Sequence, residues 1–323
     1  MTLPLFTAAP RALRHFNIFQ SFPRTWFSTL TLGQSKIKKP HTVFTFTTSE
    51  RFARVWHFFA RRALPANQWH IVIGDSSGSI RPELFAGAEI FKIYNFTHGK
   101  KIDLFLDNVI SSPITLLCDD DVYLARDIVP ALAELEDDRV KAVSLRPRTW
   151  YHLEYGDKRY EPMGSYAILM KRFGVSFMPR KEICAAKVFP PGTKAQPYYD
   201  TADYANEQLL KAGYRIPTHP ADEFTLGFDG MTTPTILLQR YGVAYVRKAL
   251  QEAKHFKAGS LNGAQVRGLY CYAAFEELYH KLFGDRPPYE YPSREELRAL
   301  PHPELYGYFD GIDDTLAKLL QKI

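Results

Sequence analysis

Three consecutive aspartates, Asp119, Asp120 and Asp121, follow a short apolar run at residues 114–118. The apolar run predicts a buried strand. Because side chains alternate along an extended chain, Asp119 and Asp121 should point to the same side where this strand ends. Two such carboxylates repel unless a cation lies between them, and Mg²⁺ or Mn²⁺ accepts oxygen ligands of this kind together with substrate phosphates. The run therefore predicts a divalent-metal site, and the alternative is an acidic turn or helix cap.

A second pair of carboxylates, Asp200 and Asp203, stands at the start of a predicted helix over residues 203–212. The positive end of a helix dipole favours an ionised carboxylate in the first turn. Such a side chain can take a proton from a substrate hydroxyl as a general base. It can equally serve only to cap the helix. The sequence leaves both roles open.

The composition is that of a globular protein. The chain has 323 residues, of which 46% are hydrophobic and 24% are charged, and this is enough for a sizeable core in one or two domains. The three cysteines are far apart in sequence, which is typical of a reducing compartment. No apolar stretch approaches the roughly 18–20 residues that span a bilayer. We therefore expect a cytoplasmic protein that is not an integral membrane protein.

The net charge of +6 comes from the N-terminal part of the chain. Residues 1–49 hold six of the 41 basic residues and none of the 35 acidic ones, so the rest of the chain is neutral. A neutral body argues against nucleic-acid binding. Basic and aromatic residues alternate in an arm at residues 1–40, which predicts peripheral contact with the inner face of an anionic membrane. A transit peptide and an extension packed on the domain are the alternatives.

Strands and helices alternate from residue 43 onward. The predicted strands are 43–47, 69–73, 89–96, 114–118 and 166–170, and the predicted helices are 50–63, 101–110 and 203–212. This order indicates an α/β fold with a sheet flanked by helices. Ligands bind such sheets at the carboxyl ends of the strands. Thr47, Asp75 and the aspartate run follow three such ends, so we expect them to meet in one crevice.

Residues 43–213 contain a series of short segments in a characteristic order. They are the first strand, the turn Ile73–Gly78, Gly99-Lys100, the D-x-D at 119–121, Met163–Ala167, and Asp200–Asp203 ahead of Gly213-Tyr214. In this the chain resembles a nucleotide-sugar glycosyltransferase of the GT-A fold, of the inverting family 2 type. The resemblance implies a Rossmann-related mixed sheet flanked by helices. It also implies a nucleoside diphosphate sugar as donor and Mn²⁺ or Mg²⁺ as cofactor.

The resemblance also implies roles for individual residues. In the family the D-x-D binds the metal on the diphosphate, and this role falls on Asp119 and Asp121. A later carboxylate is the catalytic base, which is Asp203 or Asp200 here. The family usually has Glu-Asp at the later site, whereas this chain has Thr201-Ala202 there, so the choice stays open. The turn after the second strand contacts the nucleotide base.

The remaining predicted site residues fall into three groups. Donor binding is assigned to Thr47, Thr48, Asp75, Lys100 and Asp120. Acceptor binding is assigned to Trp150 and Tyr151, because sugar rings stack on aromatic faces, and to Gly164 and Ser165, where glycine permits close backbone approach. His219 is a candidate third metal ligand. The alternatives are a solvated lysine, aromatic residues packed in the core and a surface histidine.

We expect three parts in the chain. These are the arm at 1–40, a GT-A-like domain at 41–255 with a nucleotide half to about 125 and an acceptor half from about 126, and a helical C-terminal extension at 256–323. In the extension, helices are predicted at 263–283, after the capping box Ser293–Glu296, and at 313–322.

Together these features predict a metal-dependent, non-processive glycosyltransferase that acts in polysaccharide biosynthesis or a related pathway. It would move a sugar from a nucleoside diphosphate sugar to a glycan or lipid-linked acceptor, with inversion. One alternative is a sugar-phosphate nucleotidyltransferase, which would need a glycine-rich basic loop after the first strand, where the chain has Thr47–Glu50. Another is a catalytically dead glycan-binding protein.

Overall fold

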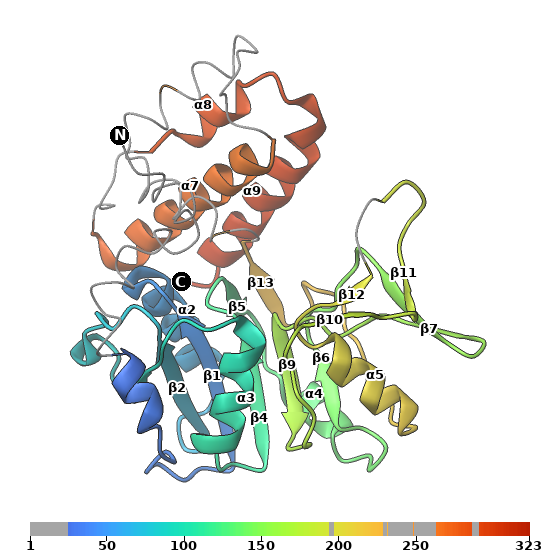
Figure 1. The fold of residues 1–323 in the computed structure, drawn as a ribbon. Coiled ribbons are helices and arrows are strands. Elements are labelled where there is room, and N and C mark those ends of the chain that lie inside the picture. Colours follow the sequence, from blue (N-terminus) through green and yellow to red (C-terminus); the bar gives the residue numbers. More distant parts are fainter. Residues whose placement is uncertain (1–24, 194–196, 229–230, 232–247, 249–262, 286–290) are drawn as a thin grey trace, which may run out of the picture. The chain divides into compact units, whose positions relative to one another are not determined.

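The computed structural model describes residues 25–193, 197–228, 231, 248, 263–285 and 291–323. The chain divides into two compact units (Figure 1). The first runs from Ser21 to Leu226, and the second includes Gly227–Ile323. No helix in the described ranges is long and apolar enough to cross a membrane.

A six-stranded mixed sheet forms the centre of the first unit, in the order β3-β2-β1-β4-β9-β6. Its strands are β1 (His41–Thr47), β2 (Trp69–Asp75), β3 (Ala88–Lys92), β4 (Ile114–Cys118), β6 (Ala142–Ser144) and β9 (Ala167–Lys171). The first four are parallel to one another, and β9 runs antiparallel to both β4 and β6. The predicted fold class, an α/β mixed sheet flanked by helices, is confirmed.

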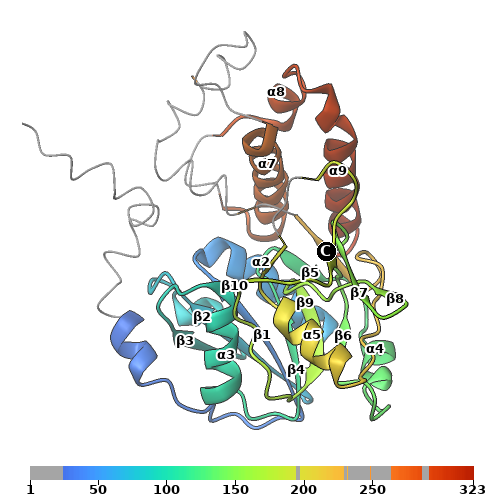
Figure 2. The same cartoon turned by 45° about the vertical axis from the view of Figure 1, so that its right-hand side comes forward.

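Helices α3 (His98–Asn108) and α5 (Asp203–Lys211) lie on the same face of this sheet in both views (Figures 1 and 2). Phe44 and Phe46 of β1 alternate with residues of the opposite face and pack against Phe105 of α3. One buried cluster joins these rings to residues of β4, β9 and α5. Helix α2 (Glu50–Ala63) packs on β1, β2 and β5 (Val122–Leu124) with a separate set of buried residues, which includes Trp56 and Phe59.

Two predicted elements of the first unit have an end that differs by three residues or more in the structure. Strand β3 ends at Lys92 instead of residue 96, because the backbone turns away and the Tyr94 N–H donates to the Thr29 hydroxyl at 2.8 Å. Helix α3 begins at His98 instead of residue 101, so Gly99 and Lys100 lie in its first turn. A Cβ at position 99 would collide with the Phe177 carbonyl. Gly99 therefore allows close packing and does not interrupt the helix.

Short strands and helices after β4 were not predicted. They are β6 of the central sheet, α4 (Val129–Glu134), a three-stranded sheet of β11 (Lys187–Val188), β7 (His152–Tyr155) and β8 (Lys158–Tyr160), a pair of β10 (Arg180–Ile183) and β12 (Tyr198–Tyr199), and a pair of β13 (Thr225–Gly227) and β5. These elements are only two to six residues long, too short for a hydrophobic period to show.

The described part of the N-terminal arm packs on the first unit. Trp26 makes an edge contact with Tyr94 at 5.6 Å between ring centroids. Lys39 donates to the carbonyls of Ala66 and Trp69 at 2.6 and 3.0 Å. Residues 25–40 therefore agree with the packed alternative. Residues 1–24 lie outside the described part of the chain, and membrane contact through the arm stays a prediction.

The described residues from 263 onward in the second unit are mainly helical, as predicted. Helix α7 spans Gly263–Phe283 and α8 spans Arg294–Arg298, and Ser293 and Glu296 form the expected capping box. The last helix, α9 (Tyr306–Leu320), begins seven residues earlier than predicted, because the 3₁₀ turn η4 (Pro303–Leu305) leads directly into it. Residues 256–262 of the predicted extension lie outside the described ranges.

Candidate active site

The carboxyl ends of β1, β2 and β4 meet at one edge of the sheet, as the sequence predicted. Thr47 pairs with Asp75 in the register of β1 and β2. The Thr47 hydroxyl also hydrogen-bonds Asp120, in the turn that follows β4. The three strand ends therefore place polar side chains from three separate segments side by side.

Lys101 is buried at this edge, and Asp120 is partly buried beside it. Burial raises the pKa of Asp120 to about 6, the Thr47 hydroxyl opposes the rise, and the charge of Asp119 adds to it. Burial lowers the pKa of Lys101 to about 8, although Asp120 and Asp119 oppose this shift. Lys101 also donates to the Asn95 side chain at 2.9 Å. A buried cation thus faces the aspartate run, and the sequence analysis missed it.

Asp119 and Asp121 are partly exposed in the turn after β4. Nε2 of His98, in the first turn of α3, lies 3.1 Å from Oδ1 of Asp119. Mg²⁺ and Mn²⁺ sites commonly take one or two carboxylates from the protein and complete their coordination with water and substrate phosphates. The two partly exposed carboxylates fit such a site.

His219 does not join these carboxylates. Its Nε2 lies 2.6 Å from Oε1 of Glu134, and its Nδ1 lies 3.0 Å from Oε2 of Glu223. In the described ranges, no three His, Cys, Asp or Glu side chains are grouped so that they could hold a metal. The structure therefore gives no support to His219 as a third metal ligand, because both ring nitrogens contact glutamates instead.

Asp75 organises its own turn. The carboxylate is fully buried and accepts hydrogen bonds from the Ser77 N–H and hydroxyl, the Gly78 N–H and the Ile80 N–H, at 2.6–3.2 Å. Both oxygens are thus used to shape residues 75–80. Any contact with a nucleotide base would have to come from another group of this turn.

Lys100 and Thr48 were both predicted to bind the donor. Nζ of Lys100 lies 4.2 Å from the centroid of the Phe96 ring, a cation–π contact. Thr48 is partly exposed beside Ser49, the N-cap residue of α2. A donor contact by either residue stays a prediction, and Lys101 of the next position is the cation that faces the aspartates.

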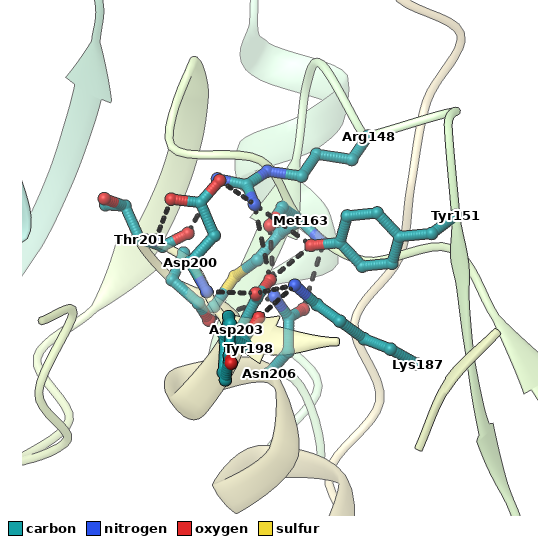
Figure 3. A network of polar contacts seen from close by, with 10 residues as sticks. Arg148, Tyr151, Met163, Lys187, Tyr198, Asp200, Thr201, Asp203 and Asn206 are labelled. Carbon is teal, nitrogen blue, oxygen red and sulfur yellow. Dashed lines mark hydrogen bonds and ion pairs between the residues drawn. The ribbon is translucent and has the colours of Figure 1, made fainter. Parts of the chain in front are cut away.

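Asp203 lies at the centre of a buried polar network (Figure 3). Its carboxylate has no exposed surface. Oδ2 lies 2.5 Å from Nζ of Lys187 and accepts from the Asp200 N–H. Oδ1 accepts from the Tyr151 hydroxyl and lies 3.4 Å from Nη1 of Arg148. A substrate hydroxyl has no access to this carboxylate, so the structure disfavours Asp203 as the base.

Asp200 is the accessible carboxylate of the pair, with 51% of its side chain exposed. Nη1 of Arg148 donates to its Oδ2 at 3.0 Å, and the Thr201 N–H donates to its Oδ1 at 2.7 Å. Burial disfavours the charged form of Arg148, but Tyr151, Asp200 and Asp203 outweigh burial and raise the pKa of the guanidinium. Its exposure therefore favours Asp200 over Asp203 for a role in proton transfer.

The two predicted acceptor aromatics differ in exposure. Trp150 is 45% exposed, whereas Tyr151 is buried and its hydroxyl donates to Asp203. The two rings meet edge to face, with their centroids 4.6 Å apart. Trp150 therefore has ring surface that a ligand could contact. Tyr151 packs against the Trp150 ring and is itself buried.

Gly164 and Ser165 are buried and connect the two acidic groups. A Cβ at Gly164 would collide with the ring of Tyr166. The Tyr166 carbonyl accepts from the Asp119 N–H at 2.8 Å. The Tyr166 ring lies 5.8 Å below the guanidinium of Arg148. A backbone hydrogen bond and a ring contact thus connect the aspartate run to the Asp200 network through Tyr166.

Sequence reasoning missed Arg148, Lys187 and Asn206 as well as Lys101. The buried Asn206 of α5 exchanges hydrogen bonds with the backbone of Met163, at 2.9 Å to its N–H and 3.0 Å to its carbonyl. Asparagine is a poor helix former, so its place inside a predicted helix was a usable signal. The three cations gave no such signal, because solvated lysine and arginine are common.

No protein-family model matches the chain, and no curated protein matches its sequence. Solved structures resemble it at low similarity. A mannosyltransferase from Pyrobaculum calidifontis, solved with GDP-Man and Mn²⁺, is 15% identical with a TM-score of 0.40, and the match covers 97% of this chain and 96% of that one. A galactosyltransferase, LgtC, solved with donor and acceptor sugar analogues, is 12% identical with a TM-score of 0.30, over 41% of this chain and 57% of that one. TarS from S. aureus is 11% identical with a TM-score of 0.31, over 87% and 54%.

Proposed function

We propose that the chain is a metal-dependent, non-processive glycosyltransferase of the GT-A type. It would move a sugar from a nucleoside diphosphate sugar to a glycan or lipid-linked acceptor, with inversion at the transferred carbon. The observation that carries this proposal is the link from Asp119 through Tyr166 to Arg148 and Asp200. This link joins neighbouring carboxylates that could bind a metal ion on a diphosphate to a separate, exposed carboxylate that could accept a proton.

The donor would bind at the carboxyl edge of β1, β2 and β4. Asp119 and Asp121 would hold Mn²⁺ or Mg²⁺, which, when bound, neutralises the diphosphate as it leaves. The buried Lys101 adds a fixed positive charge next to Asp119 and Asp120. A preorganised charge of this kind stabilises a developing anion without reorganisation of solvent. Thr47 fixes Asp120 from the end of β1.

The acceptor would bind on the side of Trp150 and Asp200. A sugar ring stacks on an exposed aromatic face, and Trp150 provides one in this part of the structure. Asp200 would take the proton of the attacking hydroxyl as the new bond forms. Inversion requires this base to lie across the reacting carbon from the leaving diphosphate. In the proposed arrangement Asp200 would lie on that opposite side, and Asp119 and Asp121 would hold the metal on the diphosphate.

The nucleotidyltransferase alternative finds less support. Residues 47–50, from the end of β1 to the start of α2, have the sequence Thr-Thr-Ser-Glu, and the Glu50 carboxylate pairs with Arg81 at 2.6 Å. A phosphate-binding loop would instead present glycine backbone and a free cation.

A donor screen tests the proposed function. Purified protein is incubated with UDP-, GDP- and other nucleotide sugars in Mn²⁺ or Mg²⁺, with mixed glycans as acceptors, and the released nucleoside diphosphate is measured. We expect release with one nucleotide family, loss of release with EDTA and recovery with Mn²⁺. Asp138→Ala, at an exposed position outside the site, serves as a control and should match the wild type. Release of pyrophosphate from a sugar phosphate and a nucleoside triphosphate would favour the nucleotidyltransferase instead.

A further inference from the structure

We propose that Arg148, with Lys187 behind it, is a positioning residue that fixes the segment 198–203 so that Asp200 meets the acceptor hydroxyl in one orientation. The inference rests on the proposed function, in which Asp200 is the base. It assigns a reason to the buried charges of Figure 3, which no reacting atom can reach.

Arg148 contacts the segment at three points. Nη1 reaches Oδ2 of Asp200 at 3.0 Å and Oδ1 of Asp203 at 3.4 Å, and Nη2 donates to the Thr201 carbonyl at 2.8 Å. A guanidinium is planar and rigid, so these donors keep a fixed mutual geometry. Arg148 thereby sets both the backbone of residue 201 and the carboxylate of residue 200.

Lys187 fixes the other end of the same segment. Its Nζ donates to the Tyr198 carbonyl at 2.6 Å and lies 2.5 Å from Oδ2 of Asp203. Its side chain is 2% exposed, as is that of Arg148. Asp203 accepts from the Asp200 N–H on the same oxygen. Residues 198–203 are therefore tied at the start, the middle and the end by buried groups.

The backbone in the middle of this segment is strained. Ala202 has φ of 73°, the one positive value for a residue other than glycine in the described chain. The left-handed region is unfavourable for alanine because its Cβ crowds the following carbonyl oxygen, and such strain persists only where the surroundings over-determine it. The Ala202 N–H donates to the Phe177 carbonyl at 3.2 Å, and its carbonyl accepts from the Asn206 side chain at 3.1 Å. The strain sits between the two carboxylates, where an exact direction for Asp200 matters most.

A double-mutant cycle tests this role. Four proteins are compared for sugar transfer: the wild type, Arg148→Gln, Asp200→Asn and the double variant. We expect Arg148→Gln to lower kcat about 10- to 100-fold, the effect of a misplacement near 1 Å, with the KM for the donor unchanged. In the Asp200→Asn background the same change should have no further effect, because Arg148 acts through Asp200. Arg139→Gln, which removes an exposed arginine, should be neutral.

A second measurement keeps the inference testable by itself. Amide hydrogen exchange of residues 198–206 should accelerate in Arg148→Gln, whereas exchange in β1 and β4 should not change. If Arg148→Gln does not fold, Arg148→Lys replaces it in this measurement. Lysine keeps the positive charge but lacks the planar set of donors of a guanidinium, so the same local acceleration is expected. Equal kcat losses in both backgrounds, or unchanged exchange in residues 198–206, would overturn the role. A wild type that transfers no sugar while the exchange pattern holds would instead refute the proposed function.

Discussion

Nζ of Lys187 and Oδ2 of Asp203 lie 2.5 Å apart, and neither side chain is more than 2% exposed. Two ions buried in this way lose most of their hydration, and each depends on the other and on further hydrogen bonds for compensation. Asp203 has those bonds from Tyr151 and from the backbone of Asp200. We therefore expect Asp203 mainly to stabilise the folded state.

Asp203→Ala should destabilise the protein severely. Removal of one partner leaves Lys187 and Arg148 buried with unbalanced charge, which typically costs about 3–5 kcal/mol of the free energy of unfolding. Urea unfolding followed by circular dichroism measures the change. Asp200→Ala is the matched control and should cost less than about 1 kcal/mol, because half of that side chain is exposed. Equal losses in the two variants would show that Asp203 is not the structural anchor.

Asp200→Asn should reduce sugar transfer by about 10²- to 10⁴-fold, the usual worth of a general base. The amide keeps the size of the side chain and can still accept from Arg148, so donor affinity and stability should stay close to those of the wild type. Steady-state kinetics and calorimetry with the nucleoside diphosphate separate the two effects. If Asp200→Asn turns over normally while folded Asp203→Asn does not, the base assignment reverts to Asp203.

Asp121→Ala should abolish metal-dependent binding of the nucleoside diphosphate. The loss of one of two carboxylate ligands removes several kcal/mol of charge stabilisation. Isothermal titration with UDP and GDP, with and without Mn²⁺, gives the readout. Wild-type protein should bind one of the two nucleotides only when the metal is present, and Asp138→Ala should behave like the wild type. Equal binding without metal would refute a metal site at the aspartate run.

Trp150→Ala should weaken the acceptor and leave the donor unaffected. An aromatic stacking contact is worth about 0.5–1.5 kcal/mol, so the KM for the acceptor should rise roughly 2- to 12-fold. Because Trp150 is 45% exposed, the melting temperature should change little. Tyr306→Ala, at a similarly exposed aromatic residue of the second unit, should leave both KM values as they are. An unchanged acceptor KM in Trp150→Ala would place the acceptor elsewhere.

His57 should make the protein less stable at acidic pH. Burial, with repulsion from Arg61, lowers the pKa of this histidine from 6.5 to about 4. The unfolded chain then binds a proton at a higher pH than the folded one, so stability falls as the pH drops from 6.5 towards 4. The full window corresponds to about 3 kcal/mol. Urea midpoints of the wild type and His57→Gln between pH 4 and 7.5 test this, and parallel curves would contradict it.

Elements with strong local signals could be predicted from the sequence. The apolar run of β4 and the bounded helix α2 were predicted with the bounds that the structure has. The edge where Thr47, Asp75 and Asp120 meet followed from the rule that parallel strands share a carboxyl end. In each case the deciding residues are neighbours in sequence or belong to one periodic pattern.

The roles of Asp203 and His219 could not be predicted in this way. Arg148 is 55 residues from Asp203, and Glu134 is 85 residues from His219. Only the packed chain shows that these charges are buried together. Sequence spacing placed Asp200 and Asp203 at the start of the same helix and did not distinguish them. Their different exposure depends on loops that have no periodic pattern.

The antiparallel direction of β9 has a consequence for any attempt to divide or recombine this domain. Cys118, at the end of β4, pairs with Ala167, at the start of β9. A cut near residue 125 would leave the outer edge of β4 without a partner in the first fragment, and β9 in the second fragment would keep only its pairing with β6. The parts of the domain before and after residue 125 are therefore not interchangeable modules. A chimera that takes the second part from another protein must carry a β9 matched to the β4 of its host, and the two fragments should rebuild the sheet only when they are produced together.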